Sequence, residues 1–169
     1  MIKSGIGYDI HKLALGEKLI IGGVKIKSEL GSIGHSDGDV LIHAIVDSLL
    51  GALALGDIGQ FFPSDDQKWK DKNSLFFLEF VKKKINSSGY KINHIDSVVV
   101  LEKPKLSNYI LQIRTNISNI LNIDLSQISV KAKTADGLDS VGKNEAIVAH
   151  VISTLANWLW VLLILHLLK

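Results

Sequence analysis

The order of apolar and polar residues along the chain predicts a mixture of strands and amphipathic helices. Strand-like stretches occupy residues 2–9, 18–21, 24–27, 95–102 and 128–134, with the Gly22-Gly23 pair as the turn of a hairpin. Apolar residues at helical spacing predict helices over about 39–55, 74–88 and 107–121, and a last helix after the glycine-marked loop 135–143. This order predicts an α+β fold: a mixed β-sheet covered by helices mainly on one face.

The last part of the chain is apolar enough to raise the question of a membrane. No Asp, Glu, Lys or Arg occurs from Val148 to Leu168, close to the roughly 20 apolar residues that span a bilayer. The alternative is a core helix that continues into an apolar tail from about residue 158, covered by a partner chain. We favour the core helix and expect no membrane association, because His150, Ser153 and Asn157 interrupt the run.

Composition narrows the class of protein. The chain has 169 residues, 47% hydrophobic and 21% charged, which predicts one globular domain over residues 1–169. The net charge is only +2, and the one basic run, Lys82-Lys83-Lys84, lies at the polar end of an amphipathic segment, so we expect no nucleic-acid partner. There is no cysteine, which excludes disulfides and thiolate metal sites. No targeting segment is visible at the N-terminus, so we expect a cytoplasmic protein.

Two segments far apart in the sequence together offer three metal ligands. Asp9 and His11 are two residues apart, so on a strand they share one face. His43 follows a cap-like stretch in which Ser36 would be the N-cap and Asp39 would complete a capping box. Three ligands with one open position are typical of catalytic zinc. The alternative is a set of ordinary hydrogen-bonded polar residues at a strand edge and a helix start.

Other clusters point to a phosphate-bearing ligand. Lys131, Lys133 and Thr134 come at the end of a predicted strand, where α/β folds place ligands, although a lysine-bearing edge strand is an equal alternative. Residues 101–106 follow another strand and offer backbone amides and cations. Asp57, in a long loop that reaches about residue 73, has a carboxylate that accepts two hydroxyl groups.

Taken together, these segments resemble one family, 2-C-methyl-D-erythritol 2,4-cyclodiphosphate synthase of the non-mevalonate isoprenoid pathway. The resemblance extends from about Ile2 to Asn157. The matching stretches are residues 7–11, 21–24, 35–40 with His43, 53–59, 131–134 and 142–145. Several linked motifs in the same order and spacing are far more specific than any one alone.

The resemblance implies a reaction and a set of ligands. Such enzymes convert 4-diphosphocytidyl-2-C-methyl-D-erythritol 2-phosphate to the 2,4-cyclodiphosphate and release CMP. The family are homotrimers with active sites between subunits. Asp9, His11 and His43 would bind Zn²⁺, and Asp136 would bind a second ion, Mg²⁺ or Mn²⁺, while His35 and Thr134 would orient the phosphates in catalysis. The implied substrate-binding residues are Ser36, Asp57, Ile58, Gly59, Phe62, Pro63, Ser64, Asp65, Asp66, Leu101, Glu102, Lys103, Pro104, Lys105, Leu106, Ser107, Lys133, Ser140 and Lys143.

The chain departs from the family pattern at three positions. Asp136 replaces the usual glutamate and is about one methylene shorter, so it reaches the second ion less directly. Lys143 and Ser140 stand where some members have arginine and phenylalanine. In the family these two positions line a channel on the three-fold axis that can hold an isoprenoid diphosphate. Without the bidentate guanidinium group and the aromatic side chain, binding of an isoprenoid diphosphate is less expected in this chain.

Two other classes of function use the same residues. A metal-dependent phosphohydrolase or phosphodiesterase with this triad would consume water and release phosphate or a simple monoester. A trimeric binding or scaffold module with a structural zinc would require a fourth protein ligand to close the site. The sequence shows no obvious candidate for that fourth ligand.

Overall fold

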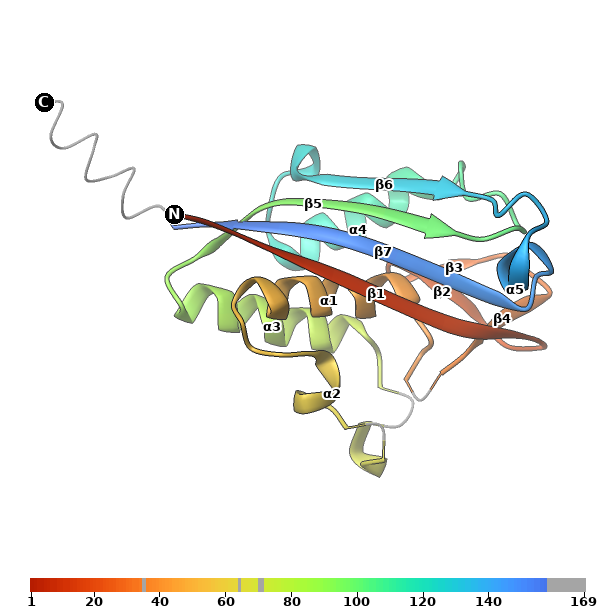
Figure 1. Cartoon of the computed structure of the whole chain (residues 1–169), viewed down its shortest axis with the longest axis horizontal. Helices are drawn as coiled ribbons and strands as arrows, with labels where there is room; N and C mark the ends of the chain where they lie inside the picture. The colour runs from red at the N-terminus through yellow and green to blue at the C-terminus, as the bar shows by residue number, and fades with distance from the viewer. Residues whose placement is uncertain (35, 64, 70–71, 158–169) are drawn as a thin grey trace, which may run out of the picture.

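The computed structural model describes residues 1–34, 36–63, 65–69 and 72–157 (Figure 1). Two predicted site residues, His35 and Ser64, and the predicted apolar tail from residue 158 lie outside the described residues. Within the described ranges, no helix combines the length and the apolar character that crossing a bilayer requires.

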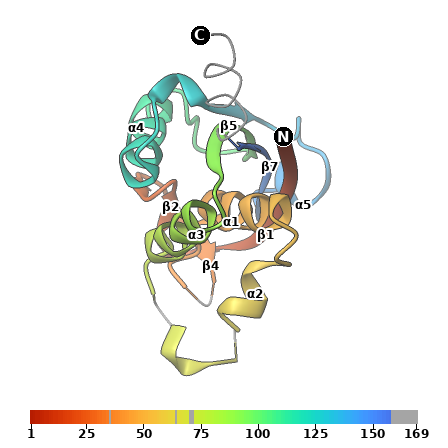
Figure 2. The ribbon, with the colours of Figure 1, turned by 90° about the vertical axis from the view of Figure 1, so that its left-hand side faces the viewer.

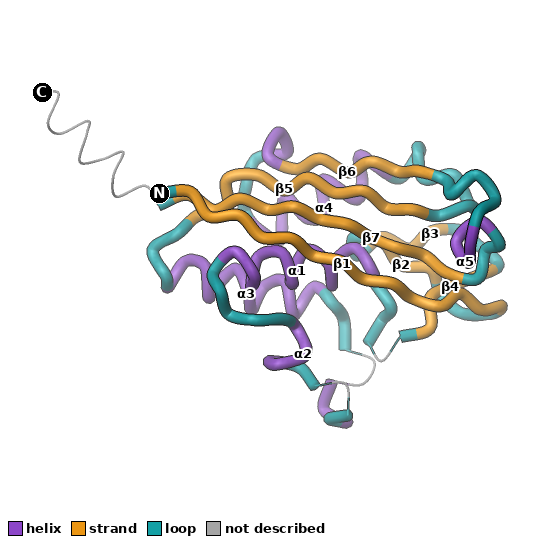
Figure 3. The backbone as a smooth tube through the Cα atoms, viewed as in Figure 1, coloured by secondary structure: helices purple, strands orange, loops and turns teal. Residues whose placement is uncertain are grey.

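The described part of the chain forms one five-stranded sheet, a two-stranded hairpin and a set of helices (Figure 3). The strands are β1 (Ile2–Leu15), β2 (Leu19–Ile21), β3 (Val24–Ile26), β4 (Leu30–Ile33), β5 (Lys91–Val100), β6 (Ile128–Lys133) and β7 (Ala146–Ala156). The helices are α1 (Val40–Ala52), α2 (Ile58–Phe61), α3 (Leu75–Ser87), α4 (Ile110–Leu121) and α5 (Asp139–Gly142), with 3-10 turns at Gln67–Trp69 and Leu125–Gln127.

The five-stranded sheet is mixed, with strand order β4-β1-β7-β5-β6. Neighbouring strands are antiparallel except for β5 and β6, which are parallel and joined through α4. Helices α1, α3 and α4 lie on the same side of the sheet (Figure 2). The predicted architecture, an α+β fold with a mixed sheet covered mainly on one face, is therefore confirmed.

The predicted last helix is wrong, because Ala146–Ala156 is the central strand β7. Its residues alternate: Ile147, Ala149, Val151, Ser153 and Leu155 are at most 1% exposed and face the helices. On the other face Ile152 is 56% exposed, although it is as apolar as the buried residues. Apolar residues on both faces hide the two-residue period of a strand, and the β-branched Ile, Val and Thr residues were the better signal.

Smaller differences occur at turns. Strand β4 was not predicted, and the loop predicted over 135–143 contains the short helix α5. Helix α1 begins after Asp39, which is its N-cap, so the predicted cap at Ser36 is wrong. Gly38 has φ of +70°, a left-handed conformation that keeps the preceding residues out of the helix.

Two glycines bring α1 directly onto the backbone of β1. A Cβ atom on Gly7 would lie 1.8 Å from the carbonyl oxygen of Ala44, and one on Gly5 would lie 2.0 Å from that of Ser48. Only glycine allows such an approach, so the spacing between strand and helix is set by backbone contact. This contact fixes the position of the first turn of α1 relative to the helix-facing residues of β1.

Candidate active site

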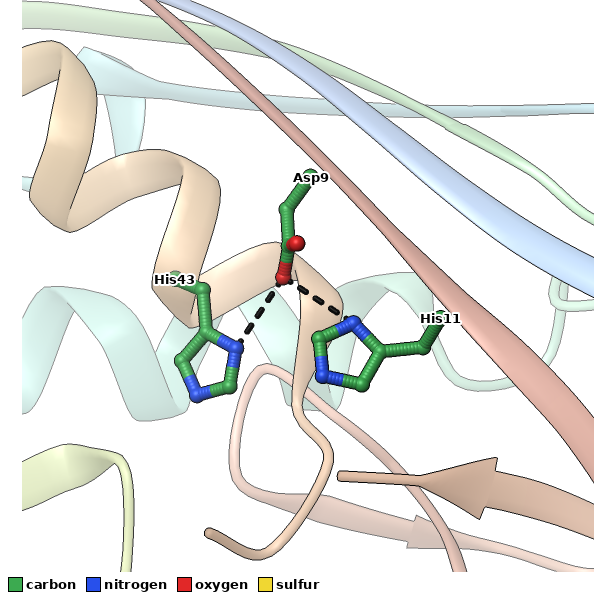
Figure 4. Close-up of side chains that lie close together, drawn as sticks. All are labelled: Asp9, His11 and His43. Carbon is green, nitrogen blue, oxygen red and sulfur yellow. Dashed lines mark hydrogen bonds and ion pairs between the residues drawn. The ribbon is translucent and has the colours of Figure 1, made fainter. Parts of the chain in front are cut away.

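The three predicted metal ligands converge between β1 and α1 (Figure 4). Asp9 and His11 lie on the same helix-facing side of β1 as Gly5 and Gly7, and His43 lies in the first turn of α1. Asp9 Oδ2 is 3.1 Å from His11 Nδ1 and 3.0 Å from His43 Nδ1. The two imidazoles and the carboxylate therefore offer one ligand atom each to a common point, as the spacing in the sequence predicted.

The geometry of His11 tests whether these residues fit a metal. Its Nδ1 atom is buried and makes no hydrogen bond to any residue that the structure describes, although Asp9 Oδ2 is only 3.1 Å away. A buried nitrogen without a partner costs free energy unless an ion accepts its lone pair. Two imidazoles and one carboxylate are a ligand set that zinc prefers in catalytic sites. The residues fit a divalent transition metal.

The electrostatics of the triad favour a negative carboxylate beside its two histidines. Burial acts to raise the pKa of Asp9, but the close contacts with the His11 and His43 imidazoles, 3.1 and 3.0 Å away, outweigh it and lower the pKa. Burial acts to lower the pKa of His43, but the hydrogen bond to Asp9 and the charges of Asp9, Asp39 and Asp37 raise it. Both shifts have one main physical cause, the close approach of the Asp9 carboxylate to the imidazoles.

The far side of the His43 ring contacts two serines. Ser36 Oγ and Ser74 Oγ each lie 2.9 Å from His43 Nε2. Ser36, predicted to contact the substrate phosphate, thus contacts a predicted metal ligand in this structure. Ser74 is fully buried, and both its amide and its hydroxyl donate hydrogen bonds to the carboxylate of Asp37.

A second buried carboxylate holds the start of α1. Asp39 is fully buried, and it accepts hydrogen bonds from the amides of Gly22, Gly23 and Ile42 at 2.9, 2.6 and 3.0 Å. It thereby joins the β2–β3 turn to the first turn of α1. Burial raises the pKa of Asp39 to about 6, although the three backbone hydrogen bonds act against the rise.

The metal ligands form part of the wall of a cavity of about 300 Å³. Its lining residues are Asp9, His11, Ser36, His43, Asp47, Ile58, Gly59, Phe62, Trp69 and Phe77. Of the substrate-binding residues predicted between 57 and 66, Ile58, Gly59 and Phe62 line the cavity. Asp57 does not, because its carboxylate caps α2 by accepting from the Gln60 amide at 3.1 Å. Pro63, Asp65 and Asp66 are also absent from the lining, and Asp66 accepts from the Lys68 amide at 3.0 Å.

A second cavity, of about 310 Å³, lies where the parallel strands β5 and β6 end. Its lining residues are Leu101, Glu102, Pro104, Lys105, Leu106, Ser107, Ile110, Ala132, Lys133 and Thr134. All residues from 101 to 107, which were predicted to bind the cytidine nucleotide, are among them except Lys103. Thr134 Oγ1 donates to Asp136 Oδ1 at 3.0 Å, so the predicted phosphate ligand and the predicted second metal ligand lie together. Among the described residues, none lines both this cavity and the cavity that contains the metal ligands.

The remaining predicted residues lie apart from both cavities. Ser140 is in α5, and Lys143 is the residue that ends that helix. Neither lines the metal cavity or the cavity at β5 and β6.

Several residues that line the metal cavity or contact His43 were not predicted from the sequence. Asp47 had a usable signal, since it lies one helical turn after His43 and so on the same face of α1. Ser74 and Asp37 had none, because their contact joins two segments 37 positions apart. Trp69 and Phe77 belong to an aromatic cluster around Phe62, which only the tertiary fold assembles.

Comparison with known proteins decides the family. The family model described as the YgbB family matches residues 2–156. The chain belongs to the YgbB family. This YgbB family member is 51% identical over 156 residues to 2-C-methyl-D-erythritol 2,4-cyclodiphosphate synthase of Clostridium perfringens. The alignment covers 92% of this chain and all of the relative.

Further similarities extend over the same region of this YgbB family member. The enzyme of that name from Alkaliphilus oremlandii is 49% identical over 154 residues, which is 91% of this chain and 98% of the relative. Among solved structures, the IspF protein of Plasmodium falciparum in complex with CDP aligns with a TM-score of 0.82 and 42% identity. That alignment covers 92% of this chain and 96% of the other. The resemblance inferred from the motifs is confirmed.

Proposed function

We propose that this YgbB family member is a metal-dependent lyase of isoprenoid precursor biosynthesis. It converts 4-diphosphocytidyl-2-C-methyl-D-erythritol 2-phosphate to 2-C-methyl-D-erythritol 2,4-cyclodiphosphate and releases CMP. The observation that carries the proposal is the Asp9–His11–His43 cluster in the wall of a cavity. It occurs in a chain 51% identical, over 92% of its length, to a relative named for that product.

The chemistry requires alignment of two anions rather than a protein nucleophile. An oxygen of the 2-phosphate attacks the β-phosphorus of the diphosphate, and the bond from that phosphorus to the bridging oxygen breaks. CMP leaves with the bridging oxygen, and no water is consumed. The attacking oxygen is already ionised near neutral pH, so no general base is needed.

The roles of the residues follow from charge. Asp9, His11 and His43 would hold Zn²⁺ and Asp136 would hold Mg²⁺ or Mn²⁺, and these ions would supply the positive charge that lets two phosphates approach. Thr134 and Lys133 bind phosphate oxygens, Thr134 by its hydroxyl and Lys133 by its ammonium group. His35 is proposed as the partner of Thr134 in orienting the phosphates. Leu101 to Ser107 surround the cytosine, and the backbone groups of this loop bind the base.

We propose further that three chains form a homotrimer with each active site between neighbours. The uncovered face of the sheet supports this, because five large apolar side chains lie exposed on its adjacent strands β1 and β7. They are Ile2 (70% exposed), Ile6 (73%), Tyr8 (51%), Ile10 (47%) and Ile152 (56%). An apolar patch of that kind is typical of a surface that another chain covers. The two cavities, which share no lining residue, would then be two halves contributed by different subunits.

A direct assay tests the proposed reaction. Purified protein is incubated with the cytidine diphosphate substrate, Zn²⁺ and Mg²⁺, and the products are separated by chromatography. We expect CMP and the cyclic diphosphate in equal amounts. Release of inorganic phosphate or an acyclic monoester instead would support a phosphohydrolase or phosphodiesterase. Tight zinc binding without turnover would support a binding module. That the enzyme works in the cytoplasm stays a prediction.

A further inference from the structure

The hydroxyl of Ser74 does not make the hydrogen bond that is expected from its position at the start of α3. Ser74 is the N-cap residue of α3, and a serine there ordinarily accepts a hydrogen bond from an amide of its own helix. Its side chain makes no such bond, and the amide of Leu75 is bound instead by the side-chain oxygen of Asn73 at 2.9 Å. The Ser74 hydroxyl points to Asp37 and His43. Its role is therefore outside the helix that it begins.

The carboxylate of Asp37 fixes the direction of this hydrogen-bond chain. Oδ2 accepts the Ser74 amide at 3.0 Å and Oδ1 accepts the Ser74 hydroxyl, so both donors of the serine are committed to one carboxylate. An ionised carboxylate only accepts hydrogen bonds. The oxygen of Ser74 can then only accept from the ring of His43, whose Nε2 lies 2.9 Å away.

It follows that Nε2 of His43 carries a proton. When the ring is neutral, its lone pair is then on Nδ1, the atom 3.0 Å from Asp9 Oδ2. Two acceptor atoms at that distance repel each other unless a cation lies between them. Ser36 also approaches Nε2 at 2.9 Å, but its hydroxyl is not committed to a carboxylate and can rotate to accept or donate.

We propose that Ser74, held by Asp37, is a positioning residue that keeps the proton of His43 on Nε2 and presents Nδ1 to the metal. This inference rests on the metal site of the proposed function. A ligating histidine commonly donates its other ring N–H to a fixed acceptor, and loss of such a partner typically weakens metal binding about 10- to 100-fold. Here the acceptor is a buried hydroxyl whose own proton is held by a carboxylate.

Asp37→Asn distinguishes this role from a merely structural one. The amide oxygen of the new side chain can accept the Ser74 amide, and its NH₂ group then donates to the Ser74 hydroxyl oxygen. The Ser74 hydroxyl no longer donates to residue 37, so it can donate to His43 Nε2 instead. This reversal favours a proton on Nδ1, where it competes with the metal, although the packing changes little.

The first measurement is the zinc dissociation constant, obtained by competition with a chromophoric chelator. We expect Ser74→Ala and Asp37→Asn to bind zinc about 10- to 100-fold more weakly than the unmodified chain. Ser74→Thr keeps the hydroxyl and should bind zinc close to the unmodified value. Ser97→Ala is the matched control, because Ser97 is also buried and its hydroxyl donates to the Ser129 carbonyl, away from the site. Equal zinc affinity in Ser74→Ala and Ser97→Ala would overturn the proposal.

The second measurement does not depend on zinc. Nitrogen-15 NMR of labelled histidine in the metal-free protein, at a pH where the His43 ring is neutral, reports which ring nitrogen carries the proton. We expect Nε2–H in the unmodified chain and a shift towards Nδ1–H in Asp37→Asn. An Nδ1–H form of the unmodified chain would overturn the proposal even if Ser74→Ala failed to fold. Absence of zinc binding by the unmodified chain would instead refute the metal site, and NMR would still decide the placement of the proton.

Discussion

The metal cavity and the cavity at the ends of β5 and β6 have similar volumes, about 300 and 310 Å³, but they are built differently. In the first, the ligands come from the sheet and from α1, and the hydroxyls of Ser36 and Ser74 contact His43 on the side of the ring away from Asp9. In the second, the walls are loops that follow two parallel strands, and Lys133 and Thr134 remain exposed. The metal cavity is therefore organised by buried contacts within one chain, whereas the cavity at the ends of β5 and β6 presents exposed groups at the edge of the sheet.

The largest expected effect comes from removing a metal ligand. His43→Ala or Asp9→Asn should weaken zinc binding by more than about 100-fold, beyond the loss caused by an outer partner, and abolish turnover. The strand-end cavity should be unaffected, so binding of CMP, measured by calorimetry, should stay near the unmodified value. Full activity with a normal zinc content in either variant would refute the assignment.

Mixing two inactive variants tests whether the cavities belong to one active site across subunits. Asp9→Asn lacks the metal half, and Lys105→Ala lacks part of the strand-end half, so each alone should be inactive. Mixed trimers contain sites with two intact halves, and unfolding and refolding the proteins together should restore a measurable fraction of activity. Failure to recover activity in trimers shown to be mixed would place both halves in the same chain.

The backbone contact between α1 and β1 predicts a pair of opposite results. Gly7→Ala should lower the free energy of unfolding by about 1–3 kcal/mol, because its Cβ would meet the backbone of Ala44 at 1.8 Å and force the helix away. It should also weaken zinc binding, since His43 moves with the helix. Gly51→Ala is the control: its Cβ meets nothing nearer than 3.9 Å, and it should stabilise α1 by roughly 0.5–1 kcal/mol. Both are measured by urea denaturation.

Asp136 should matter only for the second ion. In Asp136→Ala we expect zinc to stay bound, while the Mg²⁺ or Mn²⁺ concentration for half-maximal activity rises by roughly tenfold. That factor is typical of losing an indirect partner of a metal site, which fits the shorter reach of Asp136. A titration of activity against Mg²⁺, with zinc content measured in parallel, checks this. An unchanged Mg²⁺ requirement would mean that Asp136 is not a ligand of that ion.

The smallest effect concerns pH. Burial raises the pKa of Asp39 to about 6, above its value in the unfolded chain, so its contribution to stability is complete at low pH and is lost as pH rises through 6. Between pH 5 and pH 7 this loss should reduce the free energy of unfolding of the metal-free protein by roughly 1 kcal/mol. Asp39→Asn should lack that part of the pH dependence. An equal slope in both proteins would show that Asp39 does not titrate there.

The sequence predicted those parts of the site that depend on local geometry. Asp9 and His11 share a face because a strand has a period of two, and His43 follows a recognisable helix start. The strand-end cavity was predicted because chemistry-bearing residues directly follow two strands. The Ser74–Asp37–His43 contacts were not, since no local pattern relates residues from two segments that lie 31 to 37 positions apart. Strand β7 was mistaken for a helix because its outward residues, such as Ile152, are as apolar as its inward ones.

The central position of β7 has a consequence for how the chain folds. Ile2 pairs with Ala156, so the longest ladder of the sheet joins the first described strand to the last. Such non-local pairing pays a large loop-closure entropy before it gains contacts, and it slows folding. During synthesis, β1 has no neighbour on its β7 side until nearly all of the described chain has been made. Asp9 and His11 therefore lie on a strand whose pairing with β7 is completed last. A stable metal centre should form only in the final stage of folding.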